Sequence, residues 1–129
     1  MPNILIVDDS PTIRRMVRAA LGVVDAATFV EASSGLEAIE LLALHDIHLM
    51  VLDLNMPDMH GLEVLGFVRA QKKFAPLPIL VLTTRGDEPS RSAAVTAGAT
   101  AFMTKPFAPG DLSSRARDLL HLPSATERR

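Results

Sequence analysis

The chain has 129 residues, of which 48% are hydrophobic and 22% charged, with a formal net charge of -2 and no cysteine. This composition is typical of one soluble domain, and the lack of cysteine excludes disulfides, thiolate metal sites and thiol catalysis. The small net charge predicts no general affinity for nucleic acid. No apolar run reaches the roughly 18 residues of a membrane span or forms a signal-peptide core, so we expect a cytoplasmic protein that does not bind membranes.

Short aliphatic or β-branched runs alternate along the chain with longer segments of helical period. Ser10, Ser34 and Asp87 are typical N-cap residues of helices, and Gly98 is a typical helix end. In chain order we predict a strand at 3–7, a helix at 11–21, a strand at 28–32, a helix at 35–42, a strand at 48–52, a helix at 61–71, a strand at 77–82, a helix at 89–97, a strand at 100–104 and a helix at 111–120.

The strict alternation of strands and helices indicates parallel strands joined by right-handed crossovers, and therefore a helix-covered α/β sandwich. The third and fourth strands are apolar throughout, as is typical of strands that are buried on both faces. We expect the inner face of the first helix to comprise Ile13, Met16, Val17 and Leu21, and that of the last helix to comprise Leu112, Ala116, Leu119 and Leu120.

Polar side chains follow four of the predicted strands at their carboxyl ends. Asp8 and Asp9 follow the first strand, Asp53 the third, Thr83 the fourth and Lys105 the fifth. Parallel strands end at the same edge of a sheet, where open α/β folds bind their ligands. Two carboxylates about 4 Å apart repel by roughly 4 kcal/mol at an effective dielectric of about 20, so this cluster favours a bound cation. The pattern predicts a site for metal-assisted phosphoryl transfer.

Four segments resemble, in order and spacing, the motifs of response-regulator receiver domains: Asp8-Asp9, the run from Asp53 to Gly61 (DLNMPDMHG), Leu82-Thr83-Thr84 and Lys105-Pro106-Phe107. The resemblance covers residues 3 to about 120, and residues 13–18 together with DLNMP are most similar to single-domain chemotaxis regulators of the CheY type. It implies a flavodoxin-like (βα)5 sandwich with a five-stranded parallel sheet in the order 2-1-3-4-5 and helices on both faces. We therefore expect a receiver domain at 1–120, a short tail at 121–129 and a monomer.

The resemblance also implies roles for the residues at the strand ends. Asp53 is similar to the phosphoacceptor, which takes a phosphoryl group from a phosphohistidine of a histidine kinase or phosphotransfer domain. Asp9, Asp53 and the backbone carbonyl of Asn55 resemble the direct ligands of Mg²⁺, and Asp8 resembles the residue that holds metal-bound water. Lys105 and the hydroxyl of Thr83 would each bind a phosphoryl oxygen.

A switch and an output surface are implied in the same way. Thr83 and Phe102 match the switch pair, and Asn55 and Arg85 match the positions that tune the lifetime of the phosphorylated state. Flagellar regulators typically carry Tyr at the position of Phe102, so the resemblance leaves the output target open. The matching output face comprises Gly86, Glu88, Arg91, Val95, Phe102, Thr104, Phe107, Ala108 and Arg115.

Other interpretations are weaker. The chain could be the receiver of a longer, multidomain regulator, or a phosphate sink for another regulator in place of an active switch. A phosphatase of the haloacid-dehalogenase type would need a second Asp two residues after Asp53, where this chain has Asn55. A flavin-binding module would need a phosphate-binding loop after the first strand, where two aspartates would repel phosphate. We expect Arg14, Arg15 and Arg18 to form the solvated face of the first helix, with kinase docking as the alternative, and His45, His48, His60 and His121 to be surface or packing residues.

Overall fold

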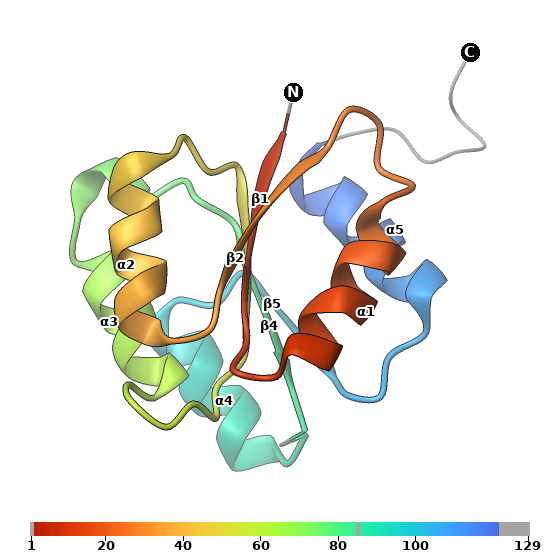
Figure 1. Cartoon of the computed structure of the whole chain (residues 1–129). Coiled ribbons are helices and arrows are strands. Elements are labelled where there is room, and N and C mark those ends of the chain that lie inside the picture. Colours follow the sequence, from red (N-terminus) through yellow and green to blue (C-terminus); the bar gives the residue numbers. More distant parts are fainter. Residues whose placement is uncertain (1, 85, 122–129) are drawn as a thin grey trace.

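The computed structural model describes residues 2–84 and 86–121, and it consists of one five-stranded sheet with helices on both faces (Figure 1). All neighbouring strands pair in parallel, in the order β2-β1-β3-β4-β5, as predicted. The elements are β1 (Asn3–Val7), α1 (Pro11–Leu21), β2 (Thr28–Ala32), α2 (Gly35–Leu44), β3 (Leu49–Leu52), α3 (Gly61–Arg69), a 3-10 turn (Lys72–Phe74), β4 (Ile79–Thr83), α4 (Glu88–Ala97), β5 (Ala101–Thr104) and α5 (Pro109–Leu119).

The sheet separates two apolar cores. Helices α1 and α5 cover one face, and α2, α3 and α4 cover the other (Figure 1). Alternate residues of β1 supply the two cores: Ile4 and Ile6 pack on the α1 and α5 side, whereas Leu5 and Val7 pack on the other side. This alternation follows from the two-residue period of a strand. The double coverage explains why β3 and β4 are buried at every position, and why every residue of these strands except Thr83 is apolar.

The predicted helix caps form as the sequence indicates. The side chains of Ser10 and Ser34 each accept a hydrogen bond from a backbone N–H three residues later, at 3.2 Å in both cases. Asp87 does the same for α4, accepting from the N–H of Ser90 at 3.1 Å. Gly98 ends α4 with a φ of 114°, a left-handed conformation that glycine adopts without steric cost.

Several boundaries and one inner-face residue differ from the predictions. Met16 is 47% exposed, because it lies about 100° around the helix from Val17, outside the arc that faces the sheet. Strand β4 begins after Pro78, which has no N–H to donate to a neighbouring strand. Helix α5 begins at Pro109, two residues earlier than predicted, because proline suits the first turn of a helix.

The other helices also differ slightly in length. Helix α2 runs two residues further than predicted, and α3 ends at Arg69 before the short 3-10 turn. Most of the predicted tail at 121–129 lies outside the described residues, which end at His121. None of the helices in the described part of the chain combines the length and the apolar character needed to cross a bilayer.

Candidate functional site

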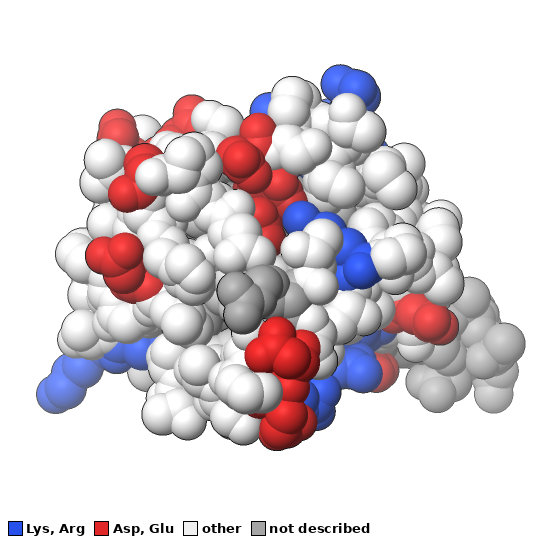
Figure 2. Space-filling view, turned by 90° about the horizontal axis from the view of Figure 1, so that it is seen from below, with Lys and Arg blue, Asp and Glu red and all other residues white. Residues whose placement is uncertain are grey.

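The carboxyl ends of β1, β3, β4 and β5 meet at one edge of the sheet. At this edge, the hydrogen bonds between neighbouring strands continue one residue beyond β3 and β5. The N–H of Asp53 donates to the carbonyl of Val7 at 2.9 Å, and the N–H of Lys105 donates to the carbonyl of Thr83 at 2.8 Å. These bonds fix the backbone from which the polar side chains project. Figure 2, which shows this face of the molecule, has acidic and basic side chains side by side near its centre.

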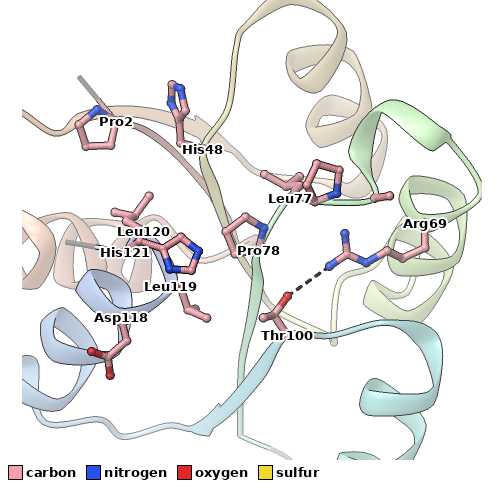
Figure 3. A pocket seen from close by; sticks show the side chains of 12 residues that line it. Pro2, His48, Arg69, Leu77, Pro78, Thr100, Asp118, Leu119, Leu120 and His121 are labelled. Atoms are coloured by element: carbon pink, nitrogen blue, oxygen red, sulfur yellow. Dashed lines mark hydrogen bonds between the residues drawn. The ribbon is translucent and has the colours of Figure 1, made fainter.

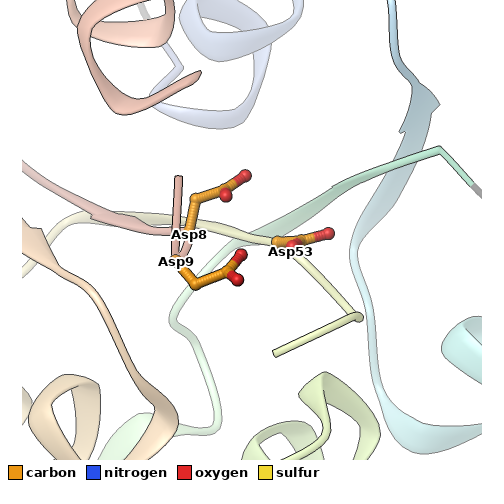
Figure 4. Close-up of side chains that lie close together, drawn as sticks. All are labelled: Asp8, Asp9 and Asp53. Carbon is orange, nitrogen blue, oxygen red and sulfur yellow. The ribbon is translucent and has the colours of Figure 1, made fainter. Parts of the chain in front are cut away.

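Three carboxylates form the acidic part of this edge. Asp8, Asp9 and Asp53 each offer an oxygen, and these oxygens all lie within 4.8 Å of one another (Figure 4). Asp8 and Asp53 are buried, whereas Asp9 is exposed. Carboxylate oxygens at this spacing suit a hard divalent cation, and the exposed side leaves room for the waters that Mg²⁺ retains. The three residues therefore fit the metal that the sequence predicts.

Lys105 supplies the positive charge inside this cluster. Its Nζ lies 2.6 Å from Oδ2 of Asp8 and 3.5 Å from Oδ1 of Asp53, and its side chain is only 10% exposed. The other carboxylate oxygen of Asp8 accepts a hydrogen bond from the N–H of Ser10 at 2.9 Å. Asp8 is thus held by two partners, and Lys105 lies between two carboxylates that would otherwise repel each other.

The protonation of Asp53 reflects these neighbours. Burial raises the pKa of the Asp53 carboxyl above its usual range, and this effect outweighs the attraction of Lys105, which lowers the pKa. The negative charge of Asp8 raises the pKa further, while the backbone N–H of Asn55 opposes the rise. A cation bound among the three carboxylates would favour the ionised, nucleophilic form of Asp53.

The loop after β3 is held close to the strand end by features that the sequence reasoning missed. A Cβ on Gly61 would lie 2.6 Å from the carbonyl oxygen of Asp53, so only glycine fits this first residue of α3. The carboxylate of Asp58 accepts hydrogen bonds from the N–H groups of Gly35 and Leu36, at 3.2 Å each, and ties the loop to the start of α2. The DLNMPDMHG run contains both residues, but nothing in it identifies the partners of Asp58.

The predicted switch pair occupies β4 and β5. Thr83 is fully buried, and its Oγ1 accepts a hydrogen bond from Nδ2 of Asn55 at 3.4 Å. Phe102 is 9% exposed and belongs to the core on the α2, α3 and α4 side. The guanidinium of Arg91 lies 5.9 Å from the centre of the Phe102 ring. In this structure Phe102 therefore points inward, and Arg91 of α4 covers its ring.

The predicted output face is partly hollow. A depression of about 320 Å³ lies between the start of α4, β5 and the start of α5. Val95 is an exposed residue of α4 that does not line the depression, and neither Glu88 nor Arg115 lines it. Arg85, the second residue predicted to tune the phosphoryl lifetime, lies outside the described residues. Six residues of the predicted face line the depression: Gly86, Arg91, Phe102, Thr104, Phe107 and Ala108.

A larger hollow, of about 570 Å³, lies at the opposite edge of the sheet (Figure 3). Arg69 borders it, and its guanidinium donates to the carbonyls of Gly98 and Phe74 at 2.9 and 2.8 Å and to Oγ1 of Thr100 at 3.2 Å. These bonds join the end of α3 to the turn between α4 and β5. The charge of Arg69 is therefore committed to internal contacts, and the hollow lies far from the carboxylate cluster.

Comparisons with known proteins agree with this geometry. The sequence profile of the family described as "Response regulator receiver domain" matches residues 4–117. The "Chemotaxis protein CheY homolog" of Campylobacter jejuni is 38% identical over 119 residues, which are 92% of each chain. The "KDP operon transcriptional regulatory protein KdpE" of Escherichia coli is 37% identical over 126 residues, which are 98% of this chain and 54% of KdpE.

A solved structure shows the same arrangement of elements. The chemotaxis response regulator CheY4 of Vibrio cholerae matches with a TM-score of 0.85 and 33% identity, over 92% of this chain and 98% of CheY4. The profile match covers nearly the whole chain. The chain also spans more than nine tenths of the CheY homolog and of CheY4, whereas it spans about half of KdpE. The protein therefore belongs to the response regulator receiver domain family, with CheY-type chemotaxis regulators among its relatives.

Proposed function

We propose that this protein is a phosphorylation-activated switch of a two-component signalling system that acts in the cytoplasm. Asp53 would accept a phosphoryl group from the phosphohistidine of a histidine kinase or phosphotransfer domain, in the presence of Mg²⁺. The observation that carries the proposal is the buried Asp53, which lies 3.5 Å from Nζ of Lys105 and within 4.8 Å of two further carboxylates. Residues 1–120 would form the receiver domain, and 121–129 a tail.

The transfer needs a nucleophile and a neutral pocket more than it needs acid–base catalysis. A carboxylate oxygen of Asp53 attacks phosphorus, and the bond from phosphorus to the imidazole nitrogen breaks. The imidazole leaves with the electron pair and then takes up a proton from water. The product is an acyl phosphate on Asp53, with the protein acting as phosphoacceptor rather than as an enzyme that acts on a separate substrate.

The three carboxylates explain the need for a metal. Asp8, Asp9, Asp53 and the carbonyl of Asn55 would hold Mg²⁺, which when bound offsets their charge and binds phosphoryl oxygens. Three carboxylates carry a charge of about -3, and Mg²⁺ with Lys105 restores about +3, so the pocket can receive an anion. Without the cation, the acidic cluster would repel the incoming phosphoryl group.

The signal would leave the site through Thr83 and Phe102. The hydroxyl of Thr83 now accepts a hydrogen bond from Asn55, and a phosphoryl oxygen would offer this hydroxyl a new acceptor. Phosphorylation would favour an active conformation of the β4–α4 connection, α4 and Phe102 over the inactive one. The size of this shift is limited by how much more favourably Thr83 and Lys105 contact the phosphoryl group in the active conformation. The output would be altered binding of a protein partner at Arg91, Val95, Phe102, Phe107 and Arg115.

A receiver that forms part of a longer regulator would use the same chemistry, as the partial coverage of KdpE illustrates. The phosphatase alternative is disfavoured by Asn55, because its amide cannot serve as the general acid that this reaction requires. The same residue donates to Thr83 at 3.4 Å, which suits a role in positioning water or in coupling to the switch.

The test is phosphorylation by a small acyl phosphate, followed by intact mass. With Mg²⁺ we expect a gain of one phosphoryl group, and no gain for Asp53→Asn or with a chelator present. Asp46→Asn is the matched control, because its side chain is 92% exposed and lies outside the cluster. No gain by the unchanged protein with Mg²⁺ would refute the proposal, and a gain in the presence of chelator would refute the role given to the carboxylates.

A further inference from the structure

We infer that Arg14 is a positioning residue for the metal site: its guanidinium, held by Glu31, fixes the peptide between Asp8 and Asp9 and thereby directs the Asp9 carboxylate toward Asp53. The inference deepens the proposed function and rests on it. The sequence predicts a solvated side chain for Arg14, and this prediction is wrong, since the side chain is only 16% exposed.

Arg14 bridges three elements at the active edge of the sheet. It lies in the first turn of α1, and its Nη1 donates to the backbone carbonyl of Asp8 at 2.6 Å. Its Nε donates to Oε1 of Glu31 in β2 at 3.0 Å. The other carboxylate oxygen of Glu31 accepts from Nη1 of Arg18, also at 3.0 Å. Glu31 is thus held on both oxygens, and in turn holds the guanidinium plane of Arg14.

The contact to the Asp8 carbonyl acts on Asp9 through covalent geometry. The carbonyl of Asp8 and the N–H and Cα of Asp9 lie in one rigid peptide plane, so fixing the oxygen fixes the direction in which Asp9 leaves the strand. Asp8 has further restraints, because its N–H donates to the carbonyl of Ala32 at 3.1 Å and its carboxylate binds Ser10 and Lys105. Asp9 is exposed, so its placement depends more on its backbone.

The guanidinium is suited to this role in a way that lysine is not. Arginine presents several N–H groups in one rigid plane, so it can bind Glu31 and the Asp8 carbonyl at the same time. A lysine at position 14 would keep the charge but would offer a single ammonium in place of the two-point contact. Charge and positioning can therefore be separated by Arg14→Lys.

For Arg14→Ala, the loss of charge and the loss of positioning change the Mg²⁺ affinity in opposite directions. Removing a cation beside an acidic cluster should strengthen the binding of Mg²⁺, because less positive charge opposes the incoming ion. Loss of a group that orients a metal ligand instead weakens metal binding, typically by about 10-fold to 100-fold. The sign of the change thus distinguishes the two effects.

The experiment measures Mg²⁺ affinity by isothermal titration calorimetry on the unphosphorylated protein. We expect Arg14→Ala and Arg14→Lys to weaken binding by about 10-fold or more. Arg18→Ala is the matched control, since Arg18 is on the same helix and pairs with the same Glu31 but has no contact with Asp8. It should change the affinity less than about twofold or strengthen it slightly. Far-UV circular dichroism checks that each variant is folded.

The inference is overturned if Arg14→Lys binds Mg²⁺ as tightly as the unchanged protein does. It is also overturned if Arg14→Ala and Arg18→Ala bind Mg²⁺ with equal affinity. If Arg14→Ala does not fold, Arg14→Lys decides. The phosphorylation assay separates this result from a failure of the proposed function. Suppose that the unchanged protein binds Mg²⁺ and gains a phosphoryl group, and that the Arg14 variants bind Mg²⁺ with normal affinity. The proposed function then stands, and only the positioning role of Arg14 is refuted.

Discussion

Replacing Lys105 by methionine tests the charge balance of the site, because the methionine keeps the length of the side chain and removes only the ammonium. The Nζ of Lys105 lies 2.6 Å from Oδ2 of Asp8 and 3.5 Å from Oδ1 of Asp53. Both carboxylates are buried, and the side chain of Lys105 is only 10% exposed. At an effective dielectric of about 20, charges 3.5 Å apart attract by roughly 5 kcal/mol. Removing one partner of a buried pair typically costs about 3–5 kcal/mol, because the other charge stays buried without compensation.

We therefore expect Lys105→Met to lower the metal-free free energy of unfolding by about 3–5 kcal/mol, out of a total of about 5–15 kcal/mol for a domain. The assay is urea unfolding at pH 7 with a chelator, followed by far-UV circular dichroism since the chain has no Trp or Tyr. The control is Lys72→Met, an exposed lysine of the 3-10 turn, which should change stability by less than about 0.5 kcal/mol.

The double variant Lys105→Met with Asp8→Asn should recover much of the loss, because it removes one of the two uncompensated charges. Mg²⁺ should stabilise Lys105→Met more than the unchanged protein, since the variant offers three carboxylates without an internal cation. A loss below about 1 kcal/mol in the single variant would refute the reasoning, as would a double variant that is less stable than the single one.

Three further predictions concern neighbouring residues. Because burial raises the pKa of Asp53, its ionised form opposes folding, so Asp53→Asn should increase the metal-free stability at pH 7. Urea titrations at several pH values should show that this gain shrinks as the pH falls through the raised pKa, and that it vanishes below about pH 4. Gly61→Ala should lower the free energy of unfolding by about 1–3 kcal/mol and weaken Mg²⁺ binding, because the added Cβ would lie 2.6 Å from backbone atoms. Gly66→Ala, on the same helix, should instead raise the free energy of unfolding by about 0.5–1 kcal/mol, because a Cβ there has nothing within 4 Å. Equal effects of the two variants on the urea midpoint would contradict this prediction. Thr83→Ala should still gain a phosphoryl group but lose the accompanying amide NMR shifts around Phe102, and unchanged shifts would argue against the coupling.

The sequence predicts the fold well because its signals are local and repeated. Short apolar runs alternate with helical segments, and the caps at Ser10, Ser34 and Asp87 are specified within three residues of the helix starts. The strand ends then bring together side chains that are far apart in the chain, such as Asp8 and Asp53. Strand order cannot be deduced from alternation alone, and its prediction depended on the family resemblance.

The missed features depend on partners that sequence periodicity does not identify. Arg14 is charged and sits among other arginines, so its burial follows only from Glu31, 17 residues away on the edge strand. Asp58 contacts the start of α2 across 22 to 23 residues, and no local pattern indicates this contact. The sequence does not separate Met16 from the inner face, because an apolar residue next to an inner-face position is hard to distinguish from one at that position.

The ion pair between Lys105 and Asp8 joins residues that are 97 positions apart. During synthesis, the three acidic residues emerge long before the last strand, so a partly made chain carries the acidic cluster without its internal cation. Contacts of such sequence separation form late in folding, because the chain must first close a large loop. A ribosome-bound or truncated chain that lacks β5 should therefore be a poor phosphoryl acceptor. This would restrict the proposed signalling to finished molecules, which also carry the proposed partner-binding surface on β5.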